Sequence, residues 1–184
     1  TYVGELVQKH VAANPRIRYV KIENKGIAAN TNAAARLAQG EYLALADHDD
    51  ILAPHAIYCM GKELQKTGAD FAYSDEALFR KSPKTAHVAH FKPDYAPEYL
   101  MACNYICHLA VFRKSLFEAI GGERPECDGA QDHDLFLRLI DAMQAKDANA
   151  APLHIPQVLY YWRVHAASTS GGTAAKPYVE KAAQ

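Results

Sequence analysis

The sequence predicts an α/β fold in which helices flank a largely parallel sheet. Over the first 80 residues, short apolar strand candidates alternate with helix candidates. One of these strands, Tyr42–Ala46, is apolar throughout, which is typical of a strand buried on both faces in a parallel sheet. Hydrophobic residues make up 49% of the chain and charged residues 22%, which excludes a disordered protein. The length of 184 residues fits one domain and is too short for two.

The elements of the first half follow from periodicity and turn chemistry. Apolar residues at a helical spacing, with stop signals at Asn14-Pro15 and Gly40, predict helices. Alternating or continuous apolar runs predict strands. The expected helices are Val3–Ala13, Asn30–Gln39 and Pro54–Lys66, and the expected strands are Ile17–Ile22, Tyr42–Ala46 and Phe71–Tyr73.

After Arg80 the pattern changes to that of an α+β continuation of the same domain. A polar stretch that contains prolines comes first and extends to Pro97. The expected helices are Glu98–Ala102, Ser115–Ile120 and Gln131–Met143, with the start of another at Lys176-Pro177-Tyr178, and the expected strands are His108–Phe112 and Ile155–Val164.

Charge and cysteine content exclude several classes of protein. The 20 Lys and Arg residues nearly balance the 21 Asp and Glu residues, and the net charge of −1 lacks the electrostatic footprint of a nucleic-acid binder. No apolar run approaches the roughly 20 residues that span a bilayer. None of the four cysteines lies in a CxxC pair, so we expect reduced thiols in a cytosolic protein rather than a zinc site.

Three carboxylates, those of Asp47, Asp49 and Asp50, follow directly after the Tyr42–Ala46 strand. Ligands of open α/β sheets bind beyond the carboxyl ends of the strands. Carboxylates this close repel one another unless a cation lies among them, and Mg²⁺ or Mn²⁺ take such oxygen ligands. A solvated acidic loop that caps the helix after Pro54 has the same composition. The position favours a metal site and leaves the capping role open.

Asp132 and Asp134 begin a strongly apolar helix. Acids in a first helical turn are common partners of the helix dipole. The alternative is that one of them is a general base, which requires a place in a cleft within roughly 3 Å of a hydroxyl.

Trp162, Arg163 and His165 end the last expected strand. A Trp–Arg pair suits a sugar or a phosphate, and a histidine suits a metal. Core packing and an ion pair explain the same residues equally well.

Asn24, Gly26 and Asn32 lie at a turn and at the start of the alanine-rich helix. Glycine there permits a close backbone approach, and the helix N-terminus would attract phosphate. Any turn uses these residue types, so the signal is weak on its own.

Several motifs follow one another in a fixed order. They are Asn24–Ile27, Asn32, Gly40–Tyr42, Asp47–Asp50 with Pro54, Tyr73–Glu76, Phe91–Asp94, Gly129–Leu135 with Arg138, His154–Pro156, and Trp162–Ser168. In this order they resemble glycosyltransferase family 2 over nearly the whole chain. The resemblance implies the GT-A fold, a Rossmann-like nucleotide-diphospho-sugar transferase sheet flanked by helices.

The resemblance also implies an inverting enzyme that moves a sugar from a nucleotide-diphosphate donor to an acceptor hydroxyl. Asp132 matches the catalytic base, and Gln131 stands where glutamate is usual. Asp47-His48-Asp49 matches the DxD motif, and Thr31 replaces an arginine of many members. The implied metal ligands for Mn²⁺ or Mg²⁺ are Asp49, Asp47, Asp50 and His165, the implied donor contacts are Asn24, Gly26, Asn32 and Asp47, and the implied acceptor contacts are Glu76, Gln131, Trp162 and Arg163.

Members of the family begin with a strand, a helix and a second strand that contact the base and the ribose. Nothing in the chain matches these segments, so we expect a partial GT-A domain from a larger protein. Residues 1–80 would be the remainder of the nucleotide-sugar half, and residues 81–184 the acceptor-binding and catalytic half. We expect an open apolar sheet edge that leaves nucleotide binding weak or pairs with another chain.

The expected partners are a nucleotide-sugar donor and a carbohydrate or lipid-linked acceptor of bacterial surface polysaccharide synthesis, without nucleic acid. The expected location is the cytoplasm, at the inner face of the bacterial inner membrane through the parent protein. Two other functions stay open from the residues alone. One is a metal-dependent phosphoesterase built on Asp47–Asp50 with histidines. The other is a non-catalytic module that binds nucleotide or carbohydrate.

Overall fold

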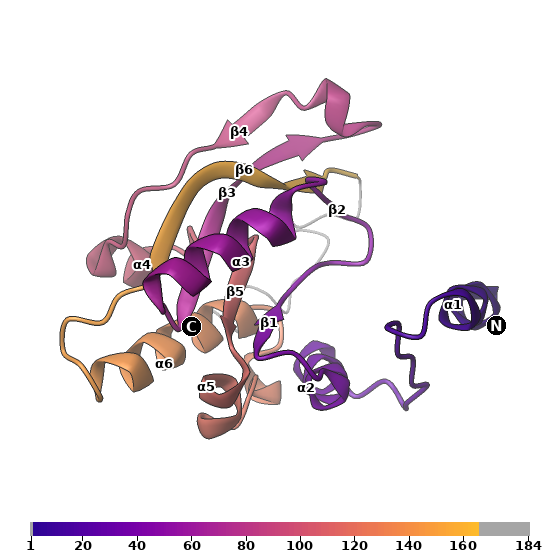
Figure 1. Cartoon of the computed structure of the whole chain (residues 1–184), viewed down its shortest axis with the longest axis horizontal. Coiled ribbons are helices and arrows are strands. Elements are labelled where there is room, and N and C mark those ends of the chain that lie inside the picture. Colours follow the sequence, from indigo (N-terminus) through magenta and orange to yellow (C-terminus); the bar gives the residue numbers. More distant parts are fainter. Residues whose placement is uncertain (1, 166–184) are drawn as a thin grey trace.

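A curled mixed sheet forms the centre of the structure, a computed structural model that describes residues 2–165 (Figure 1). Its strands are β1 (Tyr42–Ala44), β2 (Ile51–Leu52), β3 (Phe71–Phe79), β4 (Val88–His90), β5 (Ala110–Arg113) and β6 (Leu153–Arg163). Their order is β1-β5-β3-β6-β2, and β4 pairs with β3 outside this path. Of the described pairs, only β3 with β6 is parallel.

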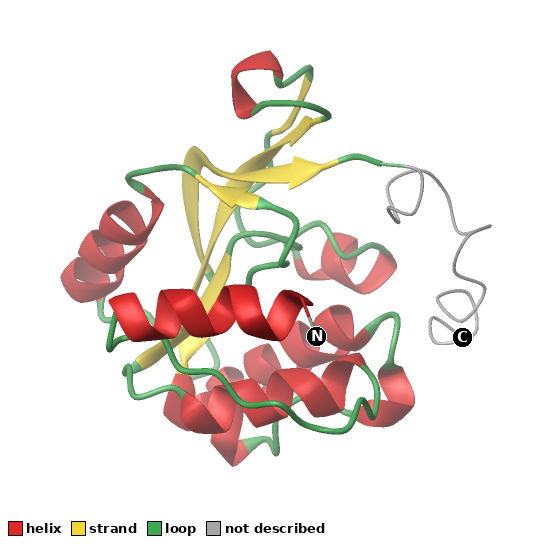
Figure 2. Ribbon diagram, turned by 90° about the vertical axis from the view of Figure 1, so that its right-hand side faces the viewer, coloured by secondary structure: helices red, strands yellow, loops and turns green. Residues whose placement is uncertain are grey.

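Helices cover both faces of this sheet (Figure 2). They are α1 (Tyr2–Ala13), α2 (Ile27–Leu37), α3 (Ala56–Thr67), α4 (Pro97–Ala102), α5 (Lys114–Ala119) and α6 (Gln131–Gln144), with short 3-10 turns η1 (Pro83–Thr85) and η2 (Pro125–Cys127). Because side chains alternate along a strand, β3 contributes residues to the hydrophobic cores on both faces of the sheet. Phe71 and Tyr73 belong to the core with α5 and α6, whereas Ala72 belongs to the core with α3. The α/β fold class is therefore confirmed.

The largely parallel sheet that we expected is wrong. An apolar run does not encode strand direction, and β1 pairs antiparallel with β5. Nor is the run buried on both faces, because Leu43 is buried while Ala44 and Ala46 are exposed. Among the described residues β1 pairs only with β5, so it lies at an edge of the sheet.

Other differences have a common cause, which is that pairing partners are not visible in a local pattern. The expected strand Ile17–Ile22 is an exposed loop, because no described strand lies beside it. The short strands β2 and β4 carry no clear pattern and were not expected. Strand β3 continues beyond Tyr73 because its polar residues Ser74–Glu76 are buried. The expected features at Ser168 and at 176–178 lie outside the described residues.

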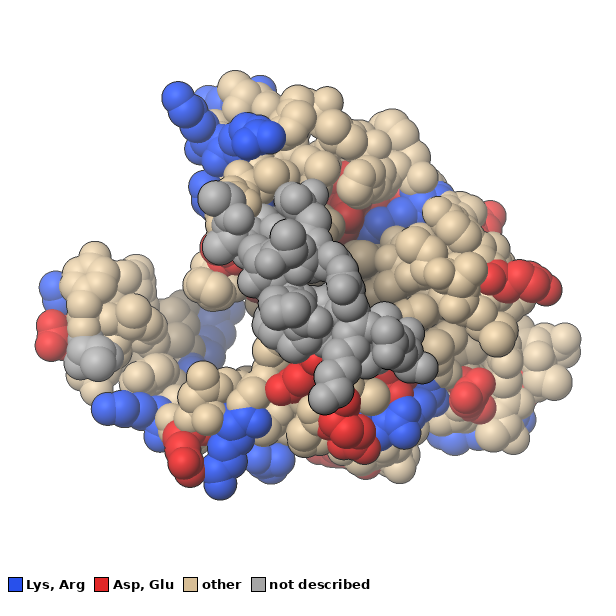
Figure 3. Space-filling view, turned by 180° about the vertical axis from the view of Figure 1, so that it is seen from behind, with Lys and Arg blue, Asp and Glu red and all other residues tan. Residues whose placement is uncertain are grey.

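Helix α1 forms as expected and lies apart from the central sheet (Figure 1). It has no buried residue. Figure 3 shows basic and acidic side chains interspersed on one face of the molecule. No helix in the described part of the chain combines the length and the apolar character needed to cross a membrane.

The N-terminus of α2 is capped by a carboxylate from far along the chain. Asp128 accepts hydrogen bonds from the backbone N–H groups of Ile27 at 3.0 Å and Ala28 at 2.8 Å. Gly26, with a φ of 105°, makes this approach possible, because a Cβ there would lie 2.0 Å from the Asp128 Oδ2 atom. The anion expected at this helix end is thus supplied by the protein itself, which satisfies two orphan donors.

Replacing this cap gives the first testable expectation. Asp128→Ala leaves two N–H groups without a partner, and we expect it to lower the free energy of unfolding by about 1–2 kcal/mol. Denaturant unfolding measures the change. Glu126→Ala, at an exposed neighbouring position, is the control and should change stability by less than about 0.5 kcal/mol. Equal stability of the two variants would contradict the capping role.

Candidate functional site

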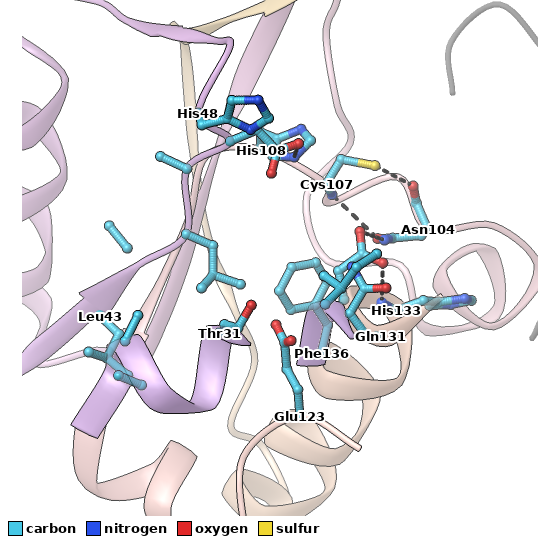
Figure 4. Close-up of a pocket in the computed structure, with 18 of the residues that line it drawn as sticks. Thr31, Leu43, His48, Asn104, Cys107, His108, Glu123, Gln131, His133 and Phe136 are labelled. Atoms are coloured by element: carbon cyan, nitrogen blue, oxygen red, sulfur yellow. Dashed lines mark hydrogen bonds and ion pairs between the residues drawn. The ribbon is translucent and has the colours of Figure 1, made fainter. Parts of the chain in front are cut away.

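A cavity of about 930 Å³ opens between α2, the end of β1 and the start of α6 (Figure 4). One wall is apolar and consists of small residues of α2 with Leu43, Phe117 and Phe136. The other side is polar and carries the acidic loop after β1, the start of α6 and the segment that precedes β5. The residues of this polar side are Asp47, His48, Asp49, Asn104, Cys107, His108, Glu123, Gln131, Asp132, His133, Trp162 and His165.

The acidic loop between β1 and β2 is fixed to the end of β6. Asp50 accepts a hydrogen bond from the Tyr160 hydroxyl and another from the Arg163 backbone N–H, both at 2.7 Å. The Arg163 Nε atom donates to the Asp49 backbone carbonyl at 2.6 Å, and the Asp49 carboxylate lies 2.8 Å from the His165 ring. Burial works against the charge of Asp49, but the hydrogen bond with His165 and its other partners hold the pKa of Asp49 below its usual value. This loop therefore presents an ionised carboxylate at the cavity.

Asp47, Asp50 and His108 converge with the geometry of a metal site. One ligand atom from each lies within 4.8 Å of the others. Two carboxylate oxygens and an imidazole nitrogen are donors that Mn²⁺ accepts, and Mg²⁺ accepts the carboxylates. The residues present fit a divalent cation.

His108 is held in place by a buried charged cluster behind the cavity. Its ring stacks on Tyr160 at a centroid distance of 4.6 Å and lies 3.6 Å from the Glu76 carboxylate. Glu76 is 2% exposed and also contacts His90 at 3.1 Å and Lys92 at 3.4 Å. Burial works to raise the pKa of Glu76, but the hydrogen bond with His108 and the charge of Lys92 lower it to about 2. Glu76 is therefore ionised at neutral pH and holds the His108 ring.

Asp132 lies in the first turn of α6 and faces the same cavity. Its Oδ2 atom accepts a hydrogen bond from the Asn104 side chain at 2.9 Å, and its Oδ1 atom accepts one from the His133 backbone N–H at 2.9 Å. These contacts fix the orientation of the carboxylate. Asp134 does not line the cavity and instead pairs with Arg138 at 2.7 Å and with Arg124. The general-base candidate of this pair is therefore Asp132.

Glu123 is a buried carboxyl group on the loop that leads from α5 to α6, and it lines the cavity. The Asn32 side chain holds its backbone, accepting from the Glu123 N–H at 2.9 Å and donating to the Glu123 carbonyl at 2.8 Å. Burial raises the pKa of Glu123 to about 7, the charges of Asp132 and Asp128 act in the same direction, and Thr31 and Arg138 oppose them.

Comparison with known proteins decides the family. Residues 2–121 match the family model of "Glycosyl transferase family 2". The chain belongs to glycosyl transferase family 2. Among curated relatives of this family member, it is 37% identical to a protein of Sinorhizobium fredii over 98% of its length and 30% identical to the O-antigen biosynthesis protein RfbC of Myxococcus xanthus over 93%. It is 26% identical to the chondroitin synthase of Escherichia coli over 90% of its length.

The family 2 chain spans only 13–23% of the length of these relatives. Solved structures agree on the fold. The chain superposes on S. aureus TarS in complex with UDP-GlcNAc with a TM-score of 0.68 and 12% identity, covering 99% of this chain and 52% of that one. It superposes on the mannosyltransferase PcManGT from Pyrobaculum calidifontis, in complex with GDP-Man and Mn²⁺, with a TM-score of 0.58 and 20% identity, covering 89% and 44%. The resemblance to the GT-A fold is thereby confirmed.

The family 2 motifs do not all meet at the cavity. The predicted site residues that line it are Asp47, Asp49, Gln131, Asp132, Trp162 and His165. Asp50 lies next to Asp47 but is engaged with β6. Arg163 supports the acidic loop and lies over the Phe79 ring at 4.5 Å. Glu76 does not line the cavity and contacts the His108 ring at 3.6 Å, and the acceptor contact expected of it stays a prediction.

The residues expected to contact the donor at the start of α2 have hydrogen-bond partners within the protein, and their contact with a donor stays a prediction. Asn24 accepts hydrogen bonds from the Gly26 backbone and from the Asn30 side chain, and Asn32 holds Glu123. None of Asn24, Gly26 and Asn32 lines the cavity, whereas Ile27 and Thr31 of the same helix do.

Sequence reasoning missed several polar cavity residues, among them Asn104, His108 and Glu123. Asn104 and His108 stand in a segment without a recognisable spacing pattern and reach the cavity through the pairing of β5 with β1 and β3. Glu123 follows Gly121-Gly122 on a turn whose burial the sequence does not show, because the Asn32 contacts that hold it come from far along the chain.

Proposed function

We propose that the chain is the catalytic domain of an inverting glycosyltransferase, which moves a sugar from a nucleotide-diphosphate donor to an acceptor hydroxyl. The observation that carries the proposal is that Asp132, oriented by Asn104, shares one cavity with the acidic loop Asp47–Asp50. An inverting transfer needs both groups, because the base must face the acceptor while the leaving diphosphate is held elsewhere. Membership of family 2 supports the reaction class.

Asp132 would accept the proton of the acceptor hydroxyl as that oxygen attacks the sugar. The Asn104 N–H donates to one carboxylate oxygen of Asp132, which orients the carboxylate toward the cavity. Gln131 precedes it, and its side chain is tied to the Gly129 N–H at 2.7 Å. Gln131 cannot ionise, so proton transfer rests on Asp132 alone within this pair. Gln131 and Trp162 would contact the acceptor.

A divalent cation would be held by Asp47, Asp50 and His108, whose ligand atoms lie within 4.8 Å of one another, with Asp49 and its partner His165 beside them. When bound, such a cation neutralises charge on the leaving diphosphate. The mannosyltransferase neighbour with GDP-Man and Mn²⁺ supports Mn²⁺ as the first metal to test. Tyr160 and Arg163 keep the acidic loop in position through Asp50.

The donor is a nucleotide sugar, by analogy with the neighbours solved with UDP-GlcNAc and GDP-Man. The acceptor is a carbohydrate or a lipid-linked carbohydrate of a bacterial surface polysaccharide, which the relatives named for O-antigen and chondroitin synthesis support. The site would then act in the cytoplasm, at the inner face of the inner membrane. Residues 1–80 would serve the donor and residues 81–184 the acceptor and the catalytic base.

One panel of assays tests this function. The protein at its natural full length is incubated with Mn²⁺, or with EDTA, and with UDP-GlcNAc, GDP-mannose and other nucleotide sugars, and sugar transfer is compared with phosphate release. We expect metal-dependent transfer. Asp49→Ala should lower it at least about 100-fold because the acidic loop that would hold the cation loses an ionised carboxylate, whereas Asp147→Ala, at an exposed position on the loop before β6, should leave it unchanged. Phosphate release without transfer would instead support a phosphoesterase.

A further inference from the structure

The loop from α5 to α6 brings a carboxyl group into the cavity away from the acidic loop. Glu123 is 4% exposed, and Figure 4 shows its side chain rising between Thr31 and Phe136. In the same view His48 and His108 lie at the other end of the cavity. Glu123 therefore faces a part of the cavity that the candidate diphosphate site does not use.

One oxygen of this carboxyl group has no partner. Among the described residues, the Glu123 Oε2 atom is a buried side-chain oxygen without a hydrogen bond. A buried polar atom without a partner costs about 1–3 kcal/mol, and native proteins rarely leave one except at functional sites. The backbone on either side is fixed by Asn32, so the side chain is held at the cavity rather than placed there by a mobile loop.

We propose that Glu123 is a specificity-determining residue whose free Oε2 atom accepts a hydrogen bond from a hydroxyl group of the carbohydrate in the cavity. The inference rests on the proposed function, since it takes the ligand to be a sugar. Glu123 does not touch the reacting atoms. Its contribution is to select and orient a sugar by one hydroxyl remote from the bond that breaks.

A hydroxyl group fits this position better than an ammonium group. Because the pKa of Glu123 is raised to about 7, both its neutral and its ionised forms are populated near neutral pH. A hydroxyl can donate to the ionised carboxylate and can donate to or accept from the neutral acid, whereas an ammonium ion can only donate and loses its charge attraction when the acid is neutral. The neighbouring wall of Ala34, Ala35 and Phe136 is apolar and suits the less polar face of a sugar ring.

The test compares two variants at position 123 with a matched control. Glu123→Met keeps a similar volume and removes both oxygens, and Glu123→Gln keeps one acceptor oxygen. Glu118→Met makes the same change on α5, where the side chain is 60% exposed. Binding of UDP-GlcNAc and GDP-mannose, and of UDP and GDP alone, is measured by calorimetry in the full-length protein with Mn²⁺. Transfer kinetics use chondroitin and free monosaccharides as acceptor probes, and thermal unfolding checks that each variant is folded.

We expect Glu123→Met either to weaken the affinity for the nucleotide sugar or to raise the KM for the acceptor at least about tenfold, which corresponds to the loss of one hydrogen bond to a charged group. Glu123→Gln should retain most of the wild-type value, and Glu118→Met should retain all of it. If the affinity for the nucleotide sugar falls while that for UDP or GDP is unchanged, the hydroxyl belongs to the donor. If donor binding is unchanged and the KM for the acceptor rises, it belongs to the acceptor.

Two outcomes separate the inference from the function on which it rests. In the first, the wild type transfers sugar and the folded Glu123→Met variant keeps both the affinity for the nucleotide sugar and the KM for the acceptor. This outcome overturns the role of Glu123 and leaves the proposed glycosyltransferase function intact. A wild-type protein that neither binds nucleotide sugars nor transfers sugar overturns the function, and the Glu123 contact falls with it.

Discussion

Asp132→Asn is expected to lower the rate of sugar transfer by about 100- to 10,000-fold, the range typical for loss of a general base. The amide keeps the size of the side chain and can still form a hydrogen bond with Asn104, which lies 2.9 Å from the carboxylate. It cannot take up the proton of the acceptor hydroxyl. The affinity for the nucleotide sugar should change little, because the acidic loop that would hold the diphosphate is untouched. Initial rates and donor binding, measured side by side, distinguish a lost base from a lost site.

The matched control for this variant lies on the same helix. Asp141→Asn makes the identical change at an exposed position of α6 and should transfer sugar at the wild-type rate. Asn104→Ala should lower the rate by a smaller factor, since it removes the group that orients Asp132 and leaves the base present. Undiminished transfer by Asp132→Asn would show that another group deprotonates the acceptor.

Glu76→Gln should destabilise the protein by about 3 kcal/mol, because it leaves Lys92 and His108 buried without their counter-charge. The side chains of Glu76 and Lys92 are each 3% exposed, so water does not compensate for the lost charge. Lys92 also donates to the backbone carbonyls of Ile106, at 2.6 Å, and of His108, so its displacement would disturb the segment that carries His108. Denaturant unfolding at neutral pH measures the change.

A double-mutant cycle shows whether the pair acts as a unit. Lys92→Met alone should cost a similar amount, whereas the double variant Glu76→Gln with Lys92→Met should cost clearly less than the sum of the two. Glu118→Gln, at an exposed position, should stay within about 0.5 kcal/mol of the wild type. Additive losses in the cycle would mean that Glu76 and Lys92 are not coupled.

The parts of the fold and of the site that depend on neighbouring residues could be predicted from the sequence. Asp47, Asp49 and Asp50 follow a short apolar strand and Asp132 begins an amphipathic helix, so the local pattern places each of them correctly at the end of an element. The order of motifs along the chain then supplies the family, which no single triplet of acids could do.

What depends on pairing between distant segments was not predictable in this way. The register of β3 against β5 brings the segment that precedes β5 to the cavity. No pattern in the sequence near His108 predicts this position. The buried polar run of β3, with Asp75 and Glu76, has the composition of a loop, and it is a strand because Lys92 and His154 supply partners from elsewhere. The antiparallel direction of β1 is likewise a property of its neighbour.

The contacts of Asp128 and Asn32 have a consequence for how the cavity meets a ligand. They join α2 to the loop before α6 across 91 to 101 residues of chain, at Ile27, Ala28 and Glu123. Closing loops of that length costs conformational entropy, and this entropy is lost when the protein folds, before any ligand binds. The α2 wall and the α6 wall therefore keep their spacing before a sugar arrives. Binding free energy that would otherwise be spent on ordering a loop remains for discrimination between ligands.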